Sequence, residues 1–182
     1  ETCRTIVETE VLRMGYYIYG WRHVPVKIDC LGEKANATRP EIEQILISNS
    51  KGVDEDTFER ELYVIRRRIE KSASRAGVSQ LYLASLSCRS IIYKGMMLAE
   101  QVAVFYPDLC DERFTSSFAI YHQRYSTNTF PQWWLAQPFR MLAHNGEINT
   151  LKGNVNWMKS HEIRMASSAF GEMADDIKPI IP

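Results

Sequence analysis

Two runs in the last third of this 182-residue chain combine side chains that can bind and activate a small molecule: 122–127 (HQRYST) and 143–147 (AHNGE). Arg124 offers a planar fork that grips a carboxylate and stays charged at any working pH. Asn145 offers a side-chain NH2, and Gly146 offers a backbone N–H with no Cβ to keep a ligand away. Such donors can hold an oxygen on which negative charge develops. The two runs therefore indicate a carboxylate clamp and an oxyanion hole.

Both runs follow apolar segments that are typical of strands, at 118–121 and 139–143. If these strands are neighbours, their ends bring the clamp and the oxyanion donors to one site. Two simpler interpretations stay open: the Asn-Gly pair as a hairpin turn, and Arg124 as a solvated or structural cation. A helical pattern, not a return strand, follows at 148–164, which argues against the hairpin.

The composition indicates a globular domain, or part of one, with 45% hydrophobic and 11% aromatic residues. Lys plus Arg and Asp plus Glu both number 22, so the net charge gives no footprint for nucleic acid or an acidic membrane. No apolar run is long enough to span a bilayer. The four cysteines, Cys3, Cys30, Cys88 and Cys110, are widely spaced, so we expect reduced thiols and no metal site.

Periodicity and turn signals give the remaining elements. They predict helices at 5–12, 54–76, 96–106 and 148–164, and strands at 16–21, 42–47, 81–86, 90–93, 118–125 and 139–143. We expect a polar loop at 32–40 and an irregular tail at 166–182. In the last helix, Leu151, Val155, Met158 and Ile163 are expected to face inward. Strands clustered between helices favour an α+β layered domain.

Four segments resemble the glutaminase domain of glutamate synthases, which are class II glutamine amidotransferases of the N-terminal-nucleophile hydrolase superfamily. These segments are GWRHVPV (20–26), LSCRSIIYKGM (86–96), HQRYSTNTFP (122–131) and LAQPFRMLAHNGEINTLKGNVNWM (135–158). They occur in the family's order and extend over nearly the whole chain. Trp134 departs from the family pattern, which usually has proline there.

The resemblance implies a four-layer αββα sandwich, here incomplete at both ends, with residues 1–182 as a partial glutamine amidotransferase domain. It implies that Arg124 binds the α-carboxylate of glutamine and that Asn145 and Gly146 stabilise the tetrahedral oxyanion; no metal is expected. The implied reaction is hydrolysis of glutamine to glutamate and ammonia, which is transferred to 2-oxoglutarate.

The family's nucleophile is a cysteine at the mature N-terminus, whose α-amino group acts as the base. We reject Cys3 for this role because two residues precede it and a helix-like run follows it directly, so we expect it to be a helix residue. The nucleophile is expected upstream of Glu1, so this interior piece should not catalyse alone. The family's ammonium-binding acid stays unassigned, because Asp175 and Asp176 do not match its segment.

The resemblance also implies FMN and an iron–sulfur cluster in the full-length protein, but no cofactor within these residues. Expected partners are glutamine, the synthase domains of the same chain, and a small NADPH-oxidising subunit or ferredoxin. Neither nucleic acid nor a membrane is expected. The expected location is the cytoplasm, or a plastid in a photosynthetic eukaryote.

Two other classes of function stay open. One is a non-catalytic glutamine-binding or regulatory domain that has lost its nucleophile. The other is a nucleic-acid module built on Arg66 to Arg68 and the pair Trp133 and Trp134. Three consecutive residues point about 100° apart on a helix, so a solvated face is the simpler interpretation of the arginines. For the tryptophans the simpler interpretation is packing, and the functional one is closure of the glutamine pocket.

Overall fold

The computed structural model describes residues 1–125, 129–139, 142–146 and 150–181. The chain divides into two compact units, each made of segments far apart in sequence. Unit 1 comprises Glu1–Tyr17, Asn49–Arg89 and Glu147–Pro182, and unit 2 comprises Ile18–Ser48 and Ser90–Gly146.

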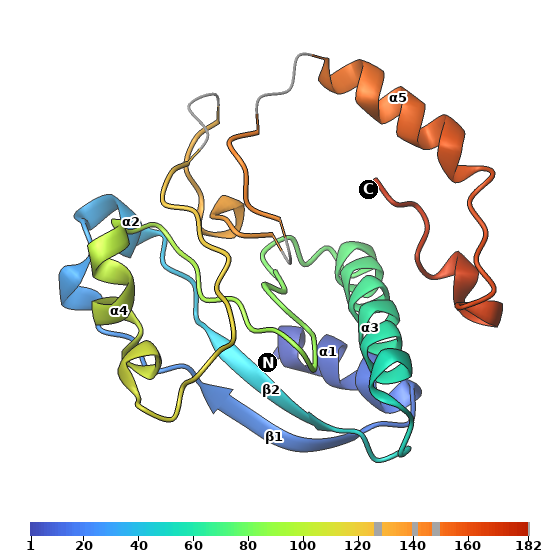
Figure 1. The fold of residues 1–182 in the computed structure, drawn as a ribbon, viewed down its shortest axis with the longest axis horizontal. Coiled ribbons are helices and arrows are strands. Elements are labelled where there is room, and N and C mark those ends of the chain that lie inside the picture. The colour runs from blue at the N-terminus through green and yellow to red at the C-terminus, as the bar shows by residue number, and fades with distance from the viewer. Residues whose placement is uncertain (126–128, 140–141, 147–149, 182) are drawn as a thin grey trace. The chain divides into compact units, whose positions relative to one another are not determined.

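Unit 1 is built on α3 (Glu55–Arg75), which packs against α1 (Thr2–Arg13) (Figure 1). Asp54 caps α3 by accepting a hydrogen bond from the Thr57 N–H at 2.9 Å, as residues at this position commonly do. The apolar side of α3 is buried, through Phe58, Leu62, Val64, Ile65, Ile69 and Ala73. These bounds confirm the helices predicted at 54–76 and 5–12.

Tyr16, which follows α1, packs against α3. Its ring is almost fully buried and lies 5.0 Å from the ring of Phe58, while its hydroxyl donates to Glu61 Oε2 at 2.7 Å. Burial, followed by the hydrogen bond to Glu61, raises the pKa of Tyr16. The phenol therefore stays neutral and acts as a buried donor.

The strands are β1 (Tyr17–His23) and β2 (Glu43–Ser48), which pair in one two-stranded sheet. Val24 N–H donates to Ile42 O at 3.0 Å and the Tyr19 hydroxyl to Ser48 Oγ at 3.3 Å, so the pair is antiparallel. Both match predicted strands. Across the described residues this mixture of helix and strand fits the α+β class, and the four-layer sandwich is not confirmed.

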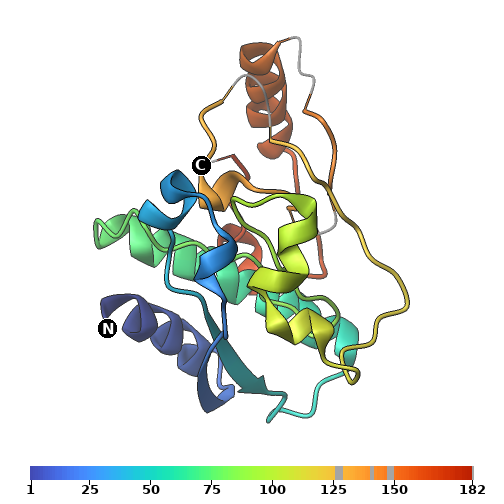
Figure 2. The same cartoon turned by 90° about the vertical axis from the view of Figure 1, so that its left-hand side faces the viewer.

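Unit 2 has its core where short helices meet: η1 (Ile28–Cys30), α2 (Glu33–Ala37), η2 (Ala99–Gln101), α4 (Val102–Phe105), η3 (Pro107–Cys110) and η4 (Trp133–Leu135). Its buried centre is Val24, Phe105, Tyr106 and Trp133. Figure 2 shows η4 beside α2, where Trp133 Nε1 donates to Ala35 O at 3.0 Å.

Several predicted elements are wrong. Helix α2 lies in the predicted loop 32–40, and residues 81–86, 90–93 and 118–125 form no strand. Side chains anchor some of these residues in place of a strand ladder: the Cys88 N–H next to them donates to Glu59, and the Tyr93 hydroxyl donates to Asp108, both at 2.9 Å. An apolar run needs a paired neighbour to become a strand, which local pattern does not report.

The helices later in the chain are shorter than predicted. Helix α4 with η2 covers 99–105 of the predicted 96–106, because the Gln101 side chain accepts from the Leu98 N–H at 2.8 Å and starts the helix there. Helix α5 (Leu151–Glu162) falls within the predicted 148–164, whose residues 148 and 149 lie outside the described residues. Leu151 and Ile163 are 66% and 83% exposed, contrary to prediction. Periodicity shows which residues share a face, not whether anything covers it. In the tail, η5 (Gly171–Asp175) is the short helix that follows.

Candidate active site

The runs that carry Arg124 and Asn145 meet in unit 2, although not through paired strands. His122 Nε2 lies 3.2 Å from Asn145 Oδ1, which joins the two runs directly. The Arg124 backbone N–H donates to Nδ1 of the same imidazole at 3.2 Å. One histidine thus contacts both residues that the sequence predicts to bind substrate.

The Arg124 side chain is exposed. Among the described residues, no carboxylate forms an ion pair with its guanidinium. This contrasts with Arg22, whose guanidinium is held by Asp108 at 2.6 and 2.8 Å. Of the two simpler interpretations of Arg124, the structural ion pair finds no support among these residues, and a carboxylate ligand can reach the fork from solvent.

A side-chain clamp sets the position of the Asn145 run. Gln137 Oε1 accepts from the His144 N–H at 2.8 Å, and Gln137 Nε2 donates to His144 O at 2.6 Å. Next to it, Phe139 and Leu142 exchange backbone hydrogen bonds of 2.8 and 2.9 Å as an isolated bridge. The amide of Gln137 therefore acts like a paired strand residue and delivers Asn145 to the site.

The bridge between Phe139 and Leu142 is antiparallel. The two residues between them, 140 and 141, lie outside the described residues. Helix α5 is the next described element along the chain. Residues 147–149, which follow the Asn-Gly pair, lie outside the described residues, so the hairpin interpretation of this pair stays a prediction. Of the predicted strand 139–143, the described residues form only this bridge.

Gly146 has φ +68°, a left-handed conformation that glycine adopts without strain. Its N–H donates to His144 Nδ1 at 2.8 Å. The backbone donor predicted for the oxyanion hole is thus engaged by a neighbouring imidazole here. To bind a ligand oxygen, this N–H must break its hydrogen bond to His144 and donate to the ligand instead.

Hydrogen bonds within unit 2 hold the segments next to the site. The Tyr125 hydroxyl donates to Gly95 O at 2.9 Å, and burial raises the pKa of Tyr125 to about 12, which keeps this donor protonated. Lys94 Nζ donates to Trp134 O at 3.0 Å and to Ala136 O at 2.7 Å. These contacts fix the loop between the Arg124 run and the Asn145 run.

The two tryptophans of this loop differ. Trp133 is 8% exposed and packs 5.6 Å from the ring of Phe105, which confirms the packing interpretation for this residue. Trp134 is 50% exposed, and its Nε1 donates to Gln132 Oε1. Its role in closing a pocket stays a prediction.

Sequence reasoning assigned no role to His122 or Gln137, although both belong to segments that carry the resemblance. His122 sits two residues before Arg124, so its ring can accept from that N–H in a local turn. Gln137 precedes a cis-proline, Pro138. For His122 the available signal was a polar residue two positions before Arg124, and for Gln137 it was a polar residue inside the segment that carries the resemblance.

The arginine triplet on α3 does not form a phosphate-binding patch. Arg66 and Arg67 pair with Glu70 at 2.9 and 2.5 Å, and Arg68 pairs with Asp176 at 2.6 Å. Their side chains are 12 to 26% exposed, so the expected solvated face is also wrong. The structure gives the nucleic-acid interpretation no support.

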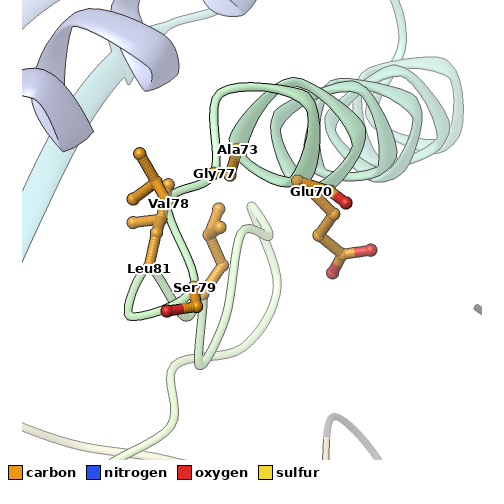
Figure 3. Close-up of a pocket in the computed structure, with 8 residues that line it drawn as sticks. Glu70, Ala73, Gly77, Val78, Ser79 and Leu81 are labelled. Carbon is orange, nitrogen blue, oxygen red and sulfur yellow. The ribbon is translucent and has the colours of Figure 1, made fainter.

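A pocket of about 290 Å³ lies at the C-terminal end of α3. Figure 3 shows the residues that line it. Its lining includes Glu70, Ala73, Gly77, Val78, Ser79 and Leu81. It contains none of the predicted site residues, and its carboxylate already binds the arginines described above.

Elsewhere in the described part of the chain, no group of three or more His, Cys, Asp or Glu residues is arranged to hold a metal. Nor is any described helix long and apolar enough to cross a membrane.

Cys3 lies in the first turn of α1 and is partly exposed, as expected of a helix residue. All four cysteines have free thiols. The rejection of Cys3 as the nucleophile stays a prediction.

Comparison with known proteins assigns the family. The profile of the class II glutamine amidotransferases matches residues 1–182, and the chain therefore belongs to that family. It is 69% identical over 181 residues to the glutamate synthase [NADPH] large chain of Azospirillum brasilense, covering 100% of this chain and 12% of that protein.

Two further relatives are more distant. The ferredoxin-dependent, chloroplastic glutamate synthase of Spinacia oleracea is 46% identical over 180 residues, and the glutamate synthase [NADPH] large chain of Bacillus subtilis is 47% identical over 168. These alignments cover 98% and 92% of this chain, and 11% of each relative. The chain thus spans 11 to 12% of the length of these relatives.

Proposed function

We propose that the natural protein containing residues 1–182 is a glutamate synthase and that these residues belong to its glutaminase domain. That domain hydrolyses glutamine to glutamate and ammonia. The observation that carries the proposal is the 69% identity, over the whole chain, to a protein named as a glutamate synthase large chain. The contact between His122 and Asn145 supports it, because it brings the two predicted halves of a glutamine site together.

In this proposal Arg124 binds the α-carboxylate of glutamine, since its guanidinium is exposed and its geometry suits a bidentate carboxylate. Asn145 donates its side-chain NH2 to the oxygen that becomes negative. Gly146 supplies the second donor once its N–H leaves His144. The exchange at Gly146 makes the second donor available only when substrate competes for it.

The proposed chemistry is acyl transfer by the family's N-terminal cysteine, which lies upstream of Glu1. Its thiolate attacks the side-chain amide carbon, and the carbonyl oxygen becomes the oxyanion held by Asn145 and Gly146. The intermediate collapses, the C–N bond breaks, and ammonia leaves after taking the proton held by the α-amino group. Water then attacks the thioester and releases glutamate. Residues 1–182 alone supply binding and oxyanion groups and are not expected to turn over glutamine.

The same proposal extends to the fold and the domain. Residues 1–182 form part of a domain. Together with further sequence before and after them, their strands and helices make up the four-layer αββα sandwich. The mixed helix and strand content supports the class. Ammonia released in this domain passes to synthase domains of the same chain, where 2-oxoglutarate is converted to glutamate.

FMN and an iron–sulfur cluster are proposed for the full-length protein and assigned to residues outside this chain. In the part of the chain that the structure describes, the four cysteines have free thiols and belong to no group of three or more possible metal ligands. The proposed electron donor is a small NADPH-oxidising subunit or ferredoxin; one relative is named for NADPH and another for ferredoxin. The proposed location is the cytoplasm, or a plastid if the source is photosynthetic, and the spinach relative is named chloroplastic.

Kinetics of the natural protein test the oxyanion assignment. Asn145→Ala should lower kcat for ammonia release from glutamine by on the order of 10²–10³, with KM little changed, because the lost hydrogen bond acts in the transition state. Asn156→Ala, an exposed asparagine on α5, is the matched control and should leave kcat unchanged. Turnover near normal in Asn145→Ala removes Asn145 from this role.

The carboxylate clamp has a different kinetic signature. Arg124→Ala should mainly raise KM for glutamine, because the carboxylate is bound equally in the ground state and the transition state. The matched control is Arg164→Ala, an exposed arginine outside the site. A fall in kcat at constant KM would show that the clamp interpretation is wrong. Glutamine binding without hydrolysis by the unsubstituted protein would favour the non-catalytic binding domain instead.

A further inference from the structure

His122 is a residue of the site to which neither the resemblance nor the residue pattern assigned a role. Its ring lies between the backbone of Arg124 and the side chain of Asn145, with 3.2 Å on each side. A role for this ring rests on the proposed function, because it concerns how the oxyanion donor is oriented.

The protonation state of His122 follows from the contact on its Nδ1 side. The Arg124 backbone N–H is a donor, so Nδ1 must present its lone pair and cannot carry a proton. In a neutral imidazole the proton is then on Nε2. Nε2 is therefore the donor in the contact with Asn145, and its partner must be the oxygen Oδ1.

This donor fixes the direction of the Asn145 amide. The amide has one oxygen and one NH2 on opposite sides of the same planar group, and rotation by half a turn exchanges them. With Oδ1 held by His122, the NH2 points away from the imidazole, and Asn145 as a whole is exposed. Without the imidazole, the amide can present its oxygen, which repels an oxyanion.

We propose that His122, as its neutral Nε2–H tautomer, is a positioning residue that orients the Asn145 amide so that its NH2 faces the oxyanion of the glutamine intermediate. Its effect is exerted through Asn145 and not on the substrate. His144 contacts the other predicted donor differently, because its ring accepts a hydrogen bond from the Gly146 N–H. His122 thus orients the donor on Asn145, whereas His144 engages the donor on Gly146.

Two substitutions separate the two contacts of the ring. His122→Gln places an amide NH2 near the position of Nε2 and so keeps a donor for Asn145, but loses the acceptor for the Arg124 N–H. His122→Asn places an amide oxygen near the position of Nδ1 and so keeps that acceptor, as in a local Asx turn, but its side chain is too short to reach Asn145. The matched control is His161→Asn, an exposed histidine on α5.

The measurement is kcat and KM for ammonia release from glutamine by the natural protein and its variants, with thermal unfolding of each. His122→Asn should lower kcat about tenfold at nearly constant KM, the size expected for loss of one orienting hydrogen bond. His122→Gln should recover kcat to within about threefold of the unsubstituted protein. His161→Asn should change neither quantity.

Three kinetic results would overturn this proposal without affecting the proposed function. Equal losses of kcat in His122→Asn and His122→Gln would mean that the ring acts only as packing. A raised KM in His122→Gln, with His122→Asn normal, would mean that the ring serves Arg124. Normal kinetics in both, while Asn145→Ala is impaired, would refute the role of His122 and leave the proposed function intact. Absence of hydrolysis by the unsubstituted protein would instead overturn the proposed function, and this inference with it.

Discussion

Gly95 should be a position where one added methyl group loosens the core of unit 2. It lies in the loop that receives the Tyr125 hydroxyl, and its φ is not in the left-handed region, so alanine meets no backbone strain. The effect of Gly95→Ala is therefore a test of packing alone.

The magnitude follows from what the new Cβ would meet. It would lie 2.9 Å from Trp133 Cε3 and closer still to Cζ3, whereas carbon atoms in contact prefer about 3.5–4.0 Å. Met97 Cε, at 2.5 Å, is the end of a flexible side chain and can move. Trp133 cannot move freely, because Ala35 O holds its Nε1 and Phe105 packs on its ring. Overpacking of this kind costs about 1–3 kcal/mol, and we expect the upper part of this range.

Hydrogen exchange in the natural protein measures this loss locally, without requiring that a large protein unfold in one step. Peptides covering α4 should exchange on the order of tenfold faster or more in Gly95→Ala, since each 1.4 kcal/mol of opening free energy is about a factor of ten. Gly32→Ala is the control, because its Cβ meets nothing within 4 Å. Equal exchange in Gly95→Ala and the unsubstituted protein would refute the packing argument.

Two further predictions concern charged groups. The hydrogen bond from Arg22 lowers the pKa of Asp108 in the folded protein. The stability that the ionised Asp108 contributes is therefore complete above the unfolded pKa of about 3.9 and is lost as pH falls through the folded pKa. The stability difference between the unsubstituted protein and Asp108→Asn should therefore shrink between pH 5 and pH 3 in denaturant titrations, and a constant difference would contradict this. Desolvation, followed by Glu59, raises the pKa of the Cys88 thiol to about 11, so Glu59→Gln should speed its alkylation at pH 8 relative to Cys110 in the same sample. An unchanged ratio of rates would show that Glu59 has no such effect.

The elements predictable from sequence were those with their own local signals. Helix α3 carries a capping aspartate, acidic residues in its first turn and a glycine beyond its end, and its bounds agree with the prediction. Strand β2 is a compact apolar run that ends at a turn cluster. In both cases the information that fixes the element lies within the element itself.

The elements around the site were not predictable in the same way. Residues 118–125 have a strand-like pattern, yet their positions are set by contacts such as the Tyr125 hydroxyl on Gly95 O, 30 residues away. The residues of the site were still found, because Arg124 and Asn145 stand out by chemistry and by their family motif. Their contact through His122 depends on ring orientation, which no sequence pattern encodes.

The identity of the nucleophile is the most direct test of the central claim, because a class II glutamine amidotransferase needs a cysteine whose own α-amino group is free. The measurement is the N-terminal sequence of the mature protein from its natural source. We expect cysteine as the first residue, with Glu1 of this chain well downstream. Any other first residue would contradict the proposed function, and would leave Arg124, Asn145 and Gly146 as parts of a pocket that binds glutamine without hydrolysing it.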